Sequence, residues 1–344
     1  MKAAIFEKAG LENLEVVDNV KEPEITEHDV LVRVKVAGVN PIDNFVVSGA
    51  LPKLIPLPNH IPGAEISGTV EELGSHVNNN NNLTKSDRVI IHAKVFDGIC
   101  DMCLNGLDMI CRNGGIISVI TNGGFAEYIS VPQRNVFKIP DNLDWNTAAS
   151  LPVTSLTPYH ALREASLKIN EYLLVFGASG STGMVAVQLA KKMGAKVIAV
   201  SKHTWIKESE FGGADYLIND YNRVADQVKD ITQDKMADVV LNSLGIETWE
   251  SSYASVGING RWVTFGTLTG PDAKLNLQSL YTRQIKLIGS TGGTRRELQE
   301  IIDMAANKEL RVKVWKKFKL DNVKEAVEAL SSKDRDGRIL LEIT

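Results

Sequence analysis

The chain has 344 residues, 44% of them hydrophobic and 23% charged, a composition typical of a folded, water-soluble protein with more than one core. Its net charge of −4 excludes a general attraction to nucleic acid or to an anionic membrane. No apolar run is long enough to span a bilayer, and "MKAAIFEKAG" lacks the apolar core of a signal peptide. We therefore expect a cytoplasmic protein that acts on a small molecule.

The first 150 residues are typical of short strands joined by turns. The segment 29–39 ("DVLVRVKVAGV") alternates as a half-buried strand does, and 65–74 and 87–95 follow the same pattern. The asparagine tract 78–82 predicts a surface loop without a functional role. This half of the chain is therefore expected to be mostly β.

The pattern changes near residue 151. Residues 171–202 predict a strand, a glycine loop, a helix and a second strand, and apolar strands recur at "YLIN", "DVVLNS", "RWVTFG" and "IKLIGS". Short apolar strands alternating with helices indicate a parallel sheet covered on both faces. The last residues predict a helix over 295–310, a helix opened by Asp321 and a strand over 338–343.

A glycine loop follows the first of these strands and opens a helix. The loop "GASGSTG" contains Gly177, Ser179, Gly180 and Gly183. Glycine there lets the backbone approach a pyrophosphate, and the helix N-terminus offers it free N–H groups. The alternative is a tight strand–helix turn without a ligand, but the strand and helix on either side favour a dinucleotide site.

The end of the second strand indicates which dinucleotide binds. NAD sites usually have an acidic residue here for the ribose 2′-hydroxyl, whereas this chain has Ser201, Lys202 and His203. A small hydroxyl beside a cation suits a 2′-phosphate, so we expect NADP(H). Lys207 and Tyr221 are candidates for contacts at the adenosine end, or else ordinary surface side chains.

Six sequence blocks together resemble the medium-chain dehydrogenase/reductases, the superfamily of zinc alcohol dehydrogenases and zeta-crystallin-like quinone oxidoreductases. They are "GVNPIDNFVVSG", "PGAEISGTV", "GGFAEYISVP", "LPVTSLTPYHAL", "GASGSTG" and "GSTGGTRREL", in family order along nearly the whole chain. The resemblance implies an α/β protein in which a GroES-like, mostly-β catalytic domain (1–150 and 290–344) surrounds a Rossmann domain (151–289) with a doubly wound parallel sheet.

The catalytic zinc ligands of the family's alcohol dehydrogenases are missing from the matching positions. Their first Cys matches Asn40, their His-Glu pair matches Ala64-Glu65, and the third ligand falls at Val153 or Thr154. Asn, Ala, Val and Thr cannot replace thiolate and imidazole around zinc. We therefore predict no catalytic zinc. His60 and His92, outside the ligand positions, are interpreted as ordinary polar residues.

Without a Lewis acid, hydride transfer favours a conjugated acceptor such as a quinone, enone or enal. "GVNPID" resembles the zinc-free quinone and enoyl reductase branch, which implies that Asn40 bonds a substrate carbonyl. Asp43 either holds the loop or relays a proton. Phe45 stands where many of these reductases have Tyr, which removes one candidate acid. The resemblance also places Thr157 near the nicotinamide, with Gly266, Gly289 and Ser290 in the same cleft. Asn242 is predicted to bind the cofactor as well.

All three cysteines lie in one segment, with the spacing Asp97-x2-Cys100-x2-Cys103-x7-Cys111. Family alcohol dehydrogenases carry four Cys at this spacing around a structural zinc, and Asp97 occupies the first position. Carboxylate is an acceptable zinc ligand, so the resemblance implies a closed four-ligand structural site. The alternative is a relic lobe with free thiols, or with a disulfide between Cys100 and Cys103.

Three functions remain open from the sequence. The first is an NADPH-dependent, catalytically zinc-free reductase of quinones or α,β-unsaturated carbonyls. The others are an alcohol dehydrogenase or aldehyde reductase, and a non-catalytic NADPH-binding redox sensor or structural protein. By family analogy we also expect a homodimer or homotetramer, formed through the exposed edge of the strand "IKLIGS".

Overall fold

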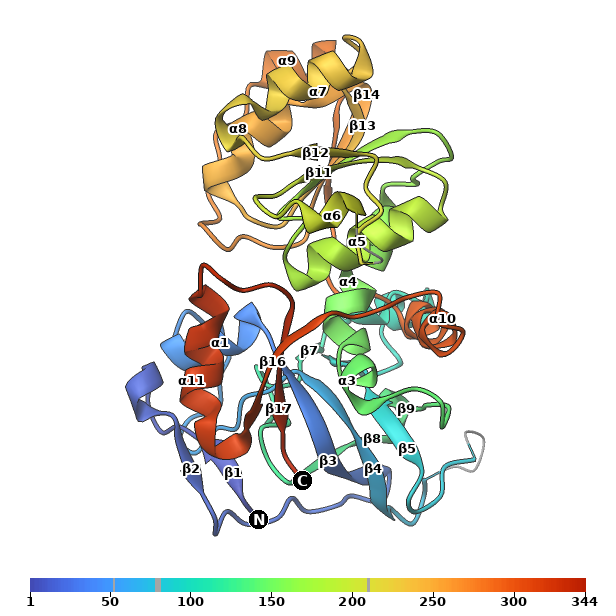
Figure 1. Ribbon diagram of the computed structural model, residues 1–344. Coiled ribbons are helices and arrows are strands. Elements are labelled where there is room, and N and C mark those ends of the chain that lie inside the picture. Colours follow the sequence, from blue (N-terminus) through green and yellow to red (C-terminus); the bar gives the residue numbers. More distant parts are fainter. Residues whose placement is uncertain (52, 78–81, 209–210) are drawn as a thin grey trace. The chain divides into compact units, whose positions relative to one another are not determined.

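The computed structural model describes residues 1–51, 53–77, 82–208 and 211–344 (Figure 1). Two compact units divide the chain, one formed by Met1–Val153 with Thr294–Thr344 and the other by Thr154–Gly293. The sequence analysis placed these boundaries a few residues earlier, after residues 150 and 289. Most of the asparagine tract expected to form a surface loop, residues 78–81, lies outside the described part of the chain.

The first unit is organised around a seven-stranded sheet. Its order is β16-β17-β3-β4-β5-β9, with β8 paired to β3, and every pairing except the parallel β16–β17 is antiparallel. The strands are β3 (Asp29–Val39), β4 (Glu65–Leu73), β5 (Arg88–Ile91), β8 (Tyr128–Pro132), β9 (Val136–Lys138), β16 (Val314–Lys319) and β17 (Arg338–Glu342). The sheet thus joins strands from both ends of the sequence.

Shorter elements complete this unit. Two small sheets pair β1 (Ala3–Ile5) with β2 (Glu15–Val17) and β6 (Lys94–Val95) with β7 (Gly115–Ile116). The helices are α1 (Pro41–Ser48), α2 (Asp101–Leu104), α3 (Trp145–Ala148), α10 (Arg295–Ala306) and α11 (Val323–Glu328). A buried apolar cluster joins β1, α1, α11 and β17, and a second one fills the space enclosed by β3, β4, β5 and β8.

The second unit is a six-stranded parallel sheet with the order β12-β11-β10-β13-β14-β15. Counted along the chain this is 3-2-1-4-5-6, the Rossmann order. The strands are β10 (Tyr172–Phe176), β11 (Lys196–Val200), β12 (Tyr216–Ile218), β13 (Ala237–Asn242), β14 (Val256–Thr264) and β15 (Lys286–Gly289). The helices are α4 (Leu156–Glu164), α5 (Ser181–Lys192), α6 (Trp205–Glu208), α7 (Val224–Thr232), α8 (Ile246–Ala254) and α9 (Leu277–Thr282).

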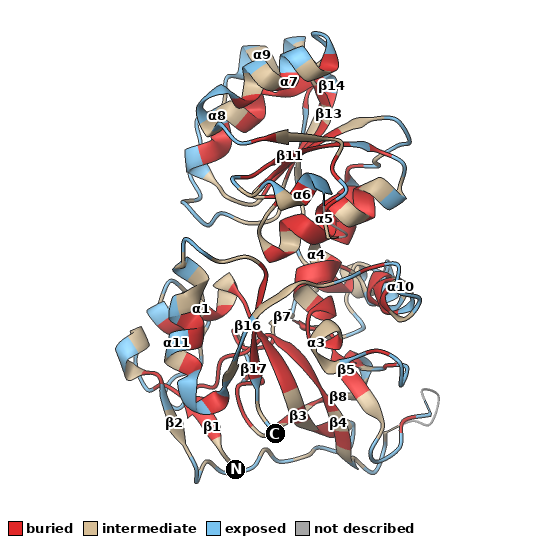
Figure 2. Cartoon of the chain, in the orientation of Figure 1, coloured by how far each residue is buried: buried red, intermediate tan, exposed pale blue. Residues whose placement is uncertain are grey.

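Both sheets form the interiors of their units, as Figure 2 shows by the buried central strands. In β10 every residue after Tyr172 is buried, as expected for a central parallel strand with helices on both faces. The predicted combination of a mostly-β GroES-like domain and a doubly wound parallel sheet is therefore confirmed. No helix in the described part of the chain is both long and apolar enough to cross a membrane.

One predicted helix is shorter in the structure. The sequence predicts a helix over 295–310, whereas α10 ends at Ala306. Thr294 caps its start, because the Thr294 Oγ1 accepts the Glu297 N–H at 3.1 Å and the Glu297 carboxylate accepts the Thr294 N–H at 2.9 Å. At the other end, Lys308 adopts a φ of 61°, a left-handed conformation that a helix cannot continue through.

Candidate functional site

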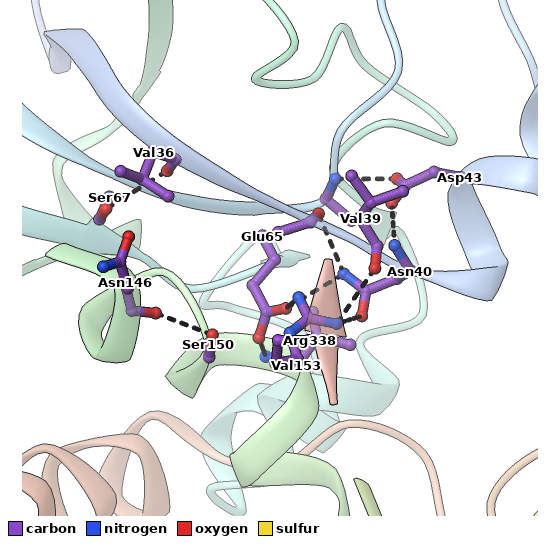
Figure 3. Close-up of polar contacts among 12 residues, drawn as sticks. Val36, Val39, Asn40, Asp43, Glu65, Ser67, Asn146, Ser150, Val153 and Arg338 are labelled. Atoms are coloured by element: carbon purple, nitrogen blue, oxygen red, sulfur yellow. Dashed lines mark hydrogen bonds and ion pairs between the residues drawn. The ribbon is translucent and has the colours of Figure 1, made fainter. Parts of the chain in front are cut away.

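A buried ion pair occupies the centre of the predicted catalytic site in the first unit (Figure 3). Glu65 is the first residue of β4 and Arg338 the first of β17, and both are about fully buried. Arg338 Nη2 lies 2.5 Å from Glu65 Oε2, while Glu65 Oε1 accepts the backbone N–H of Val153 at 2.8 Å. Since an unpaired charge would be very costly at such depth, each of these side chains requires the other.

Asn40, which precedes α1, is bound to this ion pair. Its Nδ2 donates to Glu65 Oε2 at 3.1 Å and to the Gly38 carbonyl at 3.3 Å, while its Oδ1 accepts from Arg338 Nη1 at 3.0 Å. Arg338 Nη1 also donates to the Val39 carbonyl at 3.1 Å. Both amide hydrogens of Asn40 are thus bound within the protein in this structure, and a substrate carbonyl would have to replace one of them.

Asp43 lies in the first turn of α1 and is completely buried. Its carboxylate accepts the backbone N–H groups of Asn40 at 2.8 Å and Ala64 at 3.1 Å, and the Ser118 hydroxyl at 3.4 Å. Burial raises the pKa of Asp43 to about 7, an effect that the two backbone N–H donors oppose. These contacts join the start of α1 to the segment before β4, which is the loop-holding role that the sequence left open.

The residues at the family's catalytic zinc positions do not fit a zinc ion. Asn40 offers a neutral amide, Ala64 and Val153 offer no side-chain ligand, and the charge of Glu65 is neutralised by Arg338. A catalytic zinc site needs three thiolate, imidazole or carboxylate ligands with an open position. One carboxylate, already paired with a guanidinium, does not provide that set.

The nearby histidines have local structural roles. Since a carbonyl oxygen only accepts, His60 Nε2 donates to the Ser118 carbonyl at 2.7 Å, and burial lowers the pKa of His60. His92 is buried with its ring set edge-on to Phe96. Both observations agree with the interpretation of these imidazoles as ordinary polar residues.

The glycine loop of the second unit has the shape of a pyrophosphate cradle. Gly177 has a φ of 66°, and a Cβ on Gly183 would lie 2.3 Å from the Gly177 carbonyl oxygen, so the loop requires glycine at both positions. Gly180 is the N-cap of α5, and no side chain caps that helix. Its first N–H groups, next to Ser179, are therefore without a side-chain acceptor among the described residues, which is the arrangement that the dinucleotide fingerprint predicts for binding phosphates.

The end of β11 carries the residues predicted to select the cofactor. Ser201 is buried, and its Oγ accepts the backbone N–H of His203 at 3.0 Å, whereas Lys202 is exposed. Tyr221 donates its hydroxyl to the Val200 carbonyl at 3.2 Å, and burial raises its pKa. The Tyr221 hydroxyl is thus bound to the sheet, and Ser201 and Lys202 remain the residues predicted to distinguish NADP from NAD.

Two further predicted cofactor residues, Gly266 and Ser290, lie after the carboxyl ends of the neighbouring strands β14 and β15. Ser290 follows β15, and among the described residues nothing bonds its buried hydroxyl, which a ligand's polar group would satisfy. Gly266 follows β14, and its carbonyl accepts the Thr264 hydroxyl at 3.2 Å. Thr157 is half-buried in the first turn of α4.

Asn242, at the end of β13, is bound to residues of the neighbouring helix α8 and of the loop before it. Its Nδ2 donates to the hydroxyls of Thr248 at 3.0 Å and Ser252 at 2.9 Å, and its Oδ1 accepts the Leu244 N–H at 2.9 Å. These bonds engage the amide in holding the loop between β13 and α8, and the contact of Asn242 with the cofactor stays a prediction.

The cysteine lobe brings its four predicted ligands together. The ligand atoms of Asp97, Cys100, Cys103 and Cys111 all lie within 4.8 Å of one another, and the Cys100 and Cys111 sulfurs are 3.8 Å apart. Two sulfurs bound to one tetrahedral zinc at about 2.3 Å lie about 3.8 Å apart. All three cysteines are free, so the lobe contains no disulfide.

Hydrogen bonds orient the carboxylate of this lobe. The Asp97 Oδ1 accepts the N–H groups of Cys100 at 3.0 Å and Ile99 at 2.9 Å, and its Oδ2 accepts from Asn113 at 2.7 Å. These bonds hold the pKa of Asp97 well below its usual range. The lobe therefore fits a structural zinc with a fixed carboxylate as fourth ligand.

Sequence reasoning did not find Arg338. An arginine that begins an apolar strand looks like an ordinary strand end at the surface, and its partner Glu65 is 273 residues away. The only available signal was indirect: Glu65 lies between the apolar residues Ala64 and Ile66 at the start of a strand, and a carboxylate buried there implies a partner.

Comparisons with known proteins agree with this fold and domain organisation. Residues 26–141 match the alcohol dehydrogenase GroES-like domain, and residues 181–307 match the zinc-binding dehydrogenase domain. An NAD-dependent alcohol dehydrogenase of Sulfolobus acidocaldarius is 33% identical, with all of both chains covered. An acryloyl-coenzyme A reductase of Metallosphaera sedula is 28% identical over 99% of each chain. The solved structure of a thermostable alcohol dehydrogenase from Pyrobaculum aerophilum has a TM-score of 0.90 and 36% identity, covering 99% of each chain.

The chain therefore belongs to the medium-chain dehydrogenase/reductase superfamily, as its sequence blocks indicated. Its relatives are named oxidoreductases of several kinds, and it is an NAD(P)-dependent oxidoreductase.

Proposed function

We propose that the protein is an NADPH-dependent reductase of quinones or α,β-unsaturated carbonyl compounds that works without a catalytic zinc. The observation that carries this proposal is the closed network of Asn40, Glu65 and Arg338 at the positions where zinc-dependent relatives bind the metal. The network is neutral overall and leaves no set of zinc ligands. The chemistry must therefore suit a substrate that needs no Lewis acid.

A conjugated acceptor meets this requirement. NADPH held by the glycine loop and the start of α5 would supply a hydride for the β-carbon of such an acceptor, and solvent would supply the proton that the α-carbon takes up. Conjugation spreads the developing negative charge, so a dipole can replace a metal ion. The Asn40 amide supplies that dipole, and its longer bond, to Gly38, is the one that a substrate carbonyl would replace.

The protein residues divide the remaining tasks. Arg338 and Glu65 fix the orientation of the Asn40 amide, and Asp43 fixes the backbone around it. In the second unit the glycine loop and the uncapped start of α5 receive the pyrophosphate, and Ser201 with Lys202 receives the 2′-phosphate. The family resemblance assigns Thr157 to the nicotinamide. The cysteine lobe, in this proposal, holds a structural zinc.

The relatives favour two different reactions. The acryloyl-coenzyme A reductase supports the proposal, because an acryloyl group is an α,β-unsaturated acyl group. The alcohol dehydrogenases of Sulfolobus and Pyrobaculum favour oxidation of an alcohol, and the first of them is named NAD-dependent. The second candidate is therefore an alcohol dehydrogenase or aldehyde reductase that uses protein groups in place of zinc.

A substrate panel distinguishes these candidates. NADPH and NADH oxidation would be followed with quinones, enones, enals and saturated aldehydes, and NADP⁺ and NAD⁺ reduction with alcohols, with and without a zinc chelator. We expect turnover of conjugated acceptors with NADPH that a brief chelator treatment leaves unchanged. Turnover of saturated aldehydes and alcohols but not of enones would overturn the proposal, and no turnover at all would favour the redox-sensor alternative.

A further inference from the structure

A second cluster of metal-ligating side chains lies on the surface of the first unit, at the ends of β3 and β4 opposite to Asn40 and Glu65. It consists of Glu27 and His28, which precede β3, and His76, which follows β4. The antiparallel ladder pairs Val30 with Leu73, so the chain before β3 lies beside the chain after β4. The sheet register itself therefore brings the two histidines together.

Backbone hydrogen bonds extend this pairing beyond the strands. The His76 N–H donates to the Glu27 carbonyl at 2.7 Å, and the Gly74 N–H donates to the Asp29 carbonyl at 2.9 Å. A Cβ on Gly74 would lie 2.3 Å from the Thr26 carbonyl oxygen, so the two segments are in close contact. The side chains of the cluster therefore project from two backbones that are fixed relative to each other.

The side chains converge on one point at the surface. His76 Nδ1 lies 2.9 Å from Glu27 Oε2, and the rings of His28 and His76 have their centres 5.4 Å apart. One ligand atom from each of the three residues lies within 4.8 Å of the other two. All three residues are exposed, so their side chains can move without disturbing the core, and ligand atoms of a zinc site lie about 2.0–2.2 Å from the ion.

We propose that Glu27, His28 and His76 form a surface binding site for a divalent transition-metal ion of the zinc type. Two imidazoles and one carboxylate suit Zn²⁺, Ni²⁺ or Cu²⁺, whereas Mg²⁺ and Ca²⁺ prefer oxygen ligands alone. Three protein ligands on an open surface leave a further coordination position for water. The proposal does not depend on which substrate the enzyme reduces.

Such an ion would cross-link the open ends of β3 and β4. These two strands form the centre of the seven-stranded sheet, and separating them would require breaking the metal bonds as well as the ladder. An ion that binds the folded state and not the unfolded one stabilises the fold, and the gain rises with the logarithm of its free concentration once that concentration exceeds the Kd. The expected signature is thus a rise in Tm with added zinc that depends on these three side chains.

The test is a zinc titration by calorimetry on the full-length protein whose cysteine lobe has first been saturated with zinc. We expect one further Zn²⁺ per chain in the wild type and at least about tenfold weaker binding in the single variants His28→Ala, His76→Ala and Glu27→Gln. His203→Ala is the control, because it removes a half-buried imidazole from the second unit, and it should bind like the wild type.

Cobalt separates this site from the lobe. Co²⁺ bound at Glu27, His28 and His76 has no thiolate ligand, so its binding adds no sulfur-to-metal charge-transfer band, unlike cobalt in the cysteine lobe. The proposal is overturned if the wild type shows no zinc binding beyond the lobe. It is equally overturned if the three variants retain the second ion with unchanged affinity.

Discussion

At the scale of single residues, Ser201 provides the sharpest test of cofactor choice. It occupies the position after β11 where an NAD site has a carboxylate. We expect Ser201→Asp to weaken NADPH binding at least about tenfold, because like charges brought together cost several kcal/mol, and to leave NADH binding little changed. Steady-state kcat/KM values with both cofactors measure this effect.

The matched control is Ser201→Asn, which has nearly the same size as the aspartate but no charge. It should retain most of the preference for NADPH. Equal losses for both cofactors in the aspartate variant would contradict the assignment of the 2′-phosphate to Ser201 and Lys202.

The raised pKa of Asp43 predicts how the stability of the protein depends on pH. The folded state keeps the Asp43 proton up to about pH 7, whereas the unfolded chain releases it near pH 4. Its contribution to the free energy of unfolding is therefore complete below about pH 4 and is lost as the pH rises through about 7. The free energy of unfolding of the wild type, relative to that of Asp43→Asn, should therefore fall as the pH rises from about 4 to about 7. Urea unfolding of both proteins at several pH values measures this fall. Parallel curves for the two proteins would show that Asp43 is ionised throughout.

At the scale of elements, β17 is joined to β4 by the ion pair between Arg338 and Glu65. Arg338→Met should destabilise the protein by about 3–5 kcal/mol, because it leaves the buried Glu65 without its partner. The double variant Glu65→Gln/Arg338→Met should recover much of this loss, since neither charge then remains buried. Urea unfolding of both variants and of Glu65→Gln alone measures the coupling, and purely additive losses would argue against it.

The cysteine lobe, formed by the residues around α2, is expected to contain one zinc per chain. Chelation should lower the Tm, and Cys103→Ser should abolish zinc retention, because a structural site needs its four ligands. Asp101→Asn is the control, since Asp101 lies in the lobe but pairs with Arg112. A zinc content near zero, with a Tm that chelator does not change, would contradict the assignment.

Local patterns explain what the sequence could predict. The alternation over 29–39 corresponds to β3, and the glycine loop identified the Rossmann unit because its spacing reflects one strand, one turn and one helix. The Arg338–Glu65 ion pair could not be predicted from the sequence, because it depends on which strands become neighbours in the sheet. The hydrogen bonds of Asn242 could not be predicted for a related reason: its position at the end of a strand was visible, but the two hydroxyls of α8 that accept from its amide were not.

At the scale of the whole molecule, the outer edge of the parallel sheet predicts self-association. In the described part of the chain, β15 pairs with β14 alone, and the side chain of Leu287 on it is 40% exposed. An exposed edge with apolar side chains favours pairing with a second copy. Sedimentation should therefore give at least twice the 37.6 kDa of one chain.

Leu287→Arg should lower that mass, because a charge on the edge strand opposes pairing. Ile169→Arg is the control, since it places the same charge at an exposed position outside β15. A monomeric wild type, or an unchanged mass in Leu287→Arg, would contradict association through this edge.

The position of β17 in the first sheet also has a consequence for biosynthesis. This strand, formed by Arg338–Glu342, lies between β16 and β3, so the sheet cannot be completed until this segment, which follows the Rossmann unit in the sequence, has been translated. The unit Thr154–Gly293, in contrast, is one continuous segment and is completed earlier. Since domains generally fold as units during synthesis, the Rossmann unit is expected to fold before Arg338 is available to pair with Glu65.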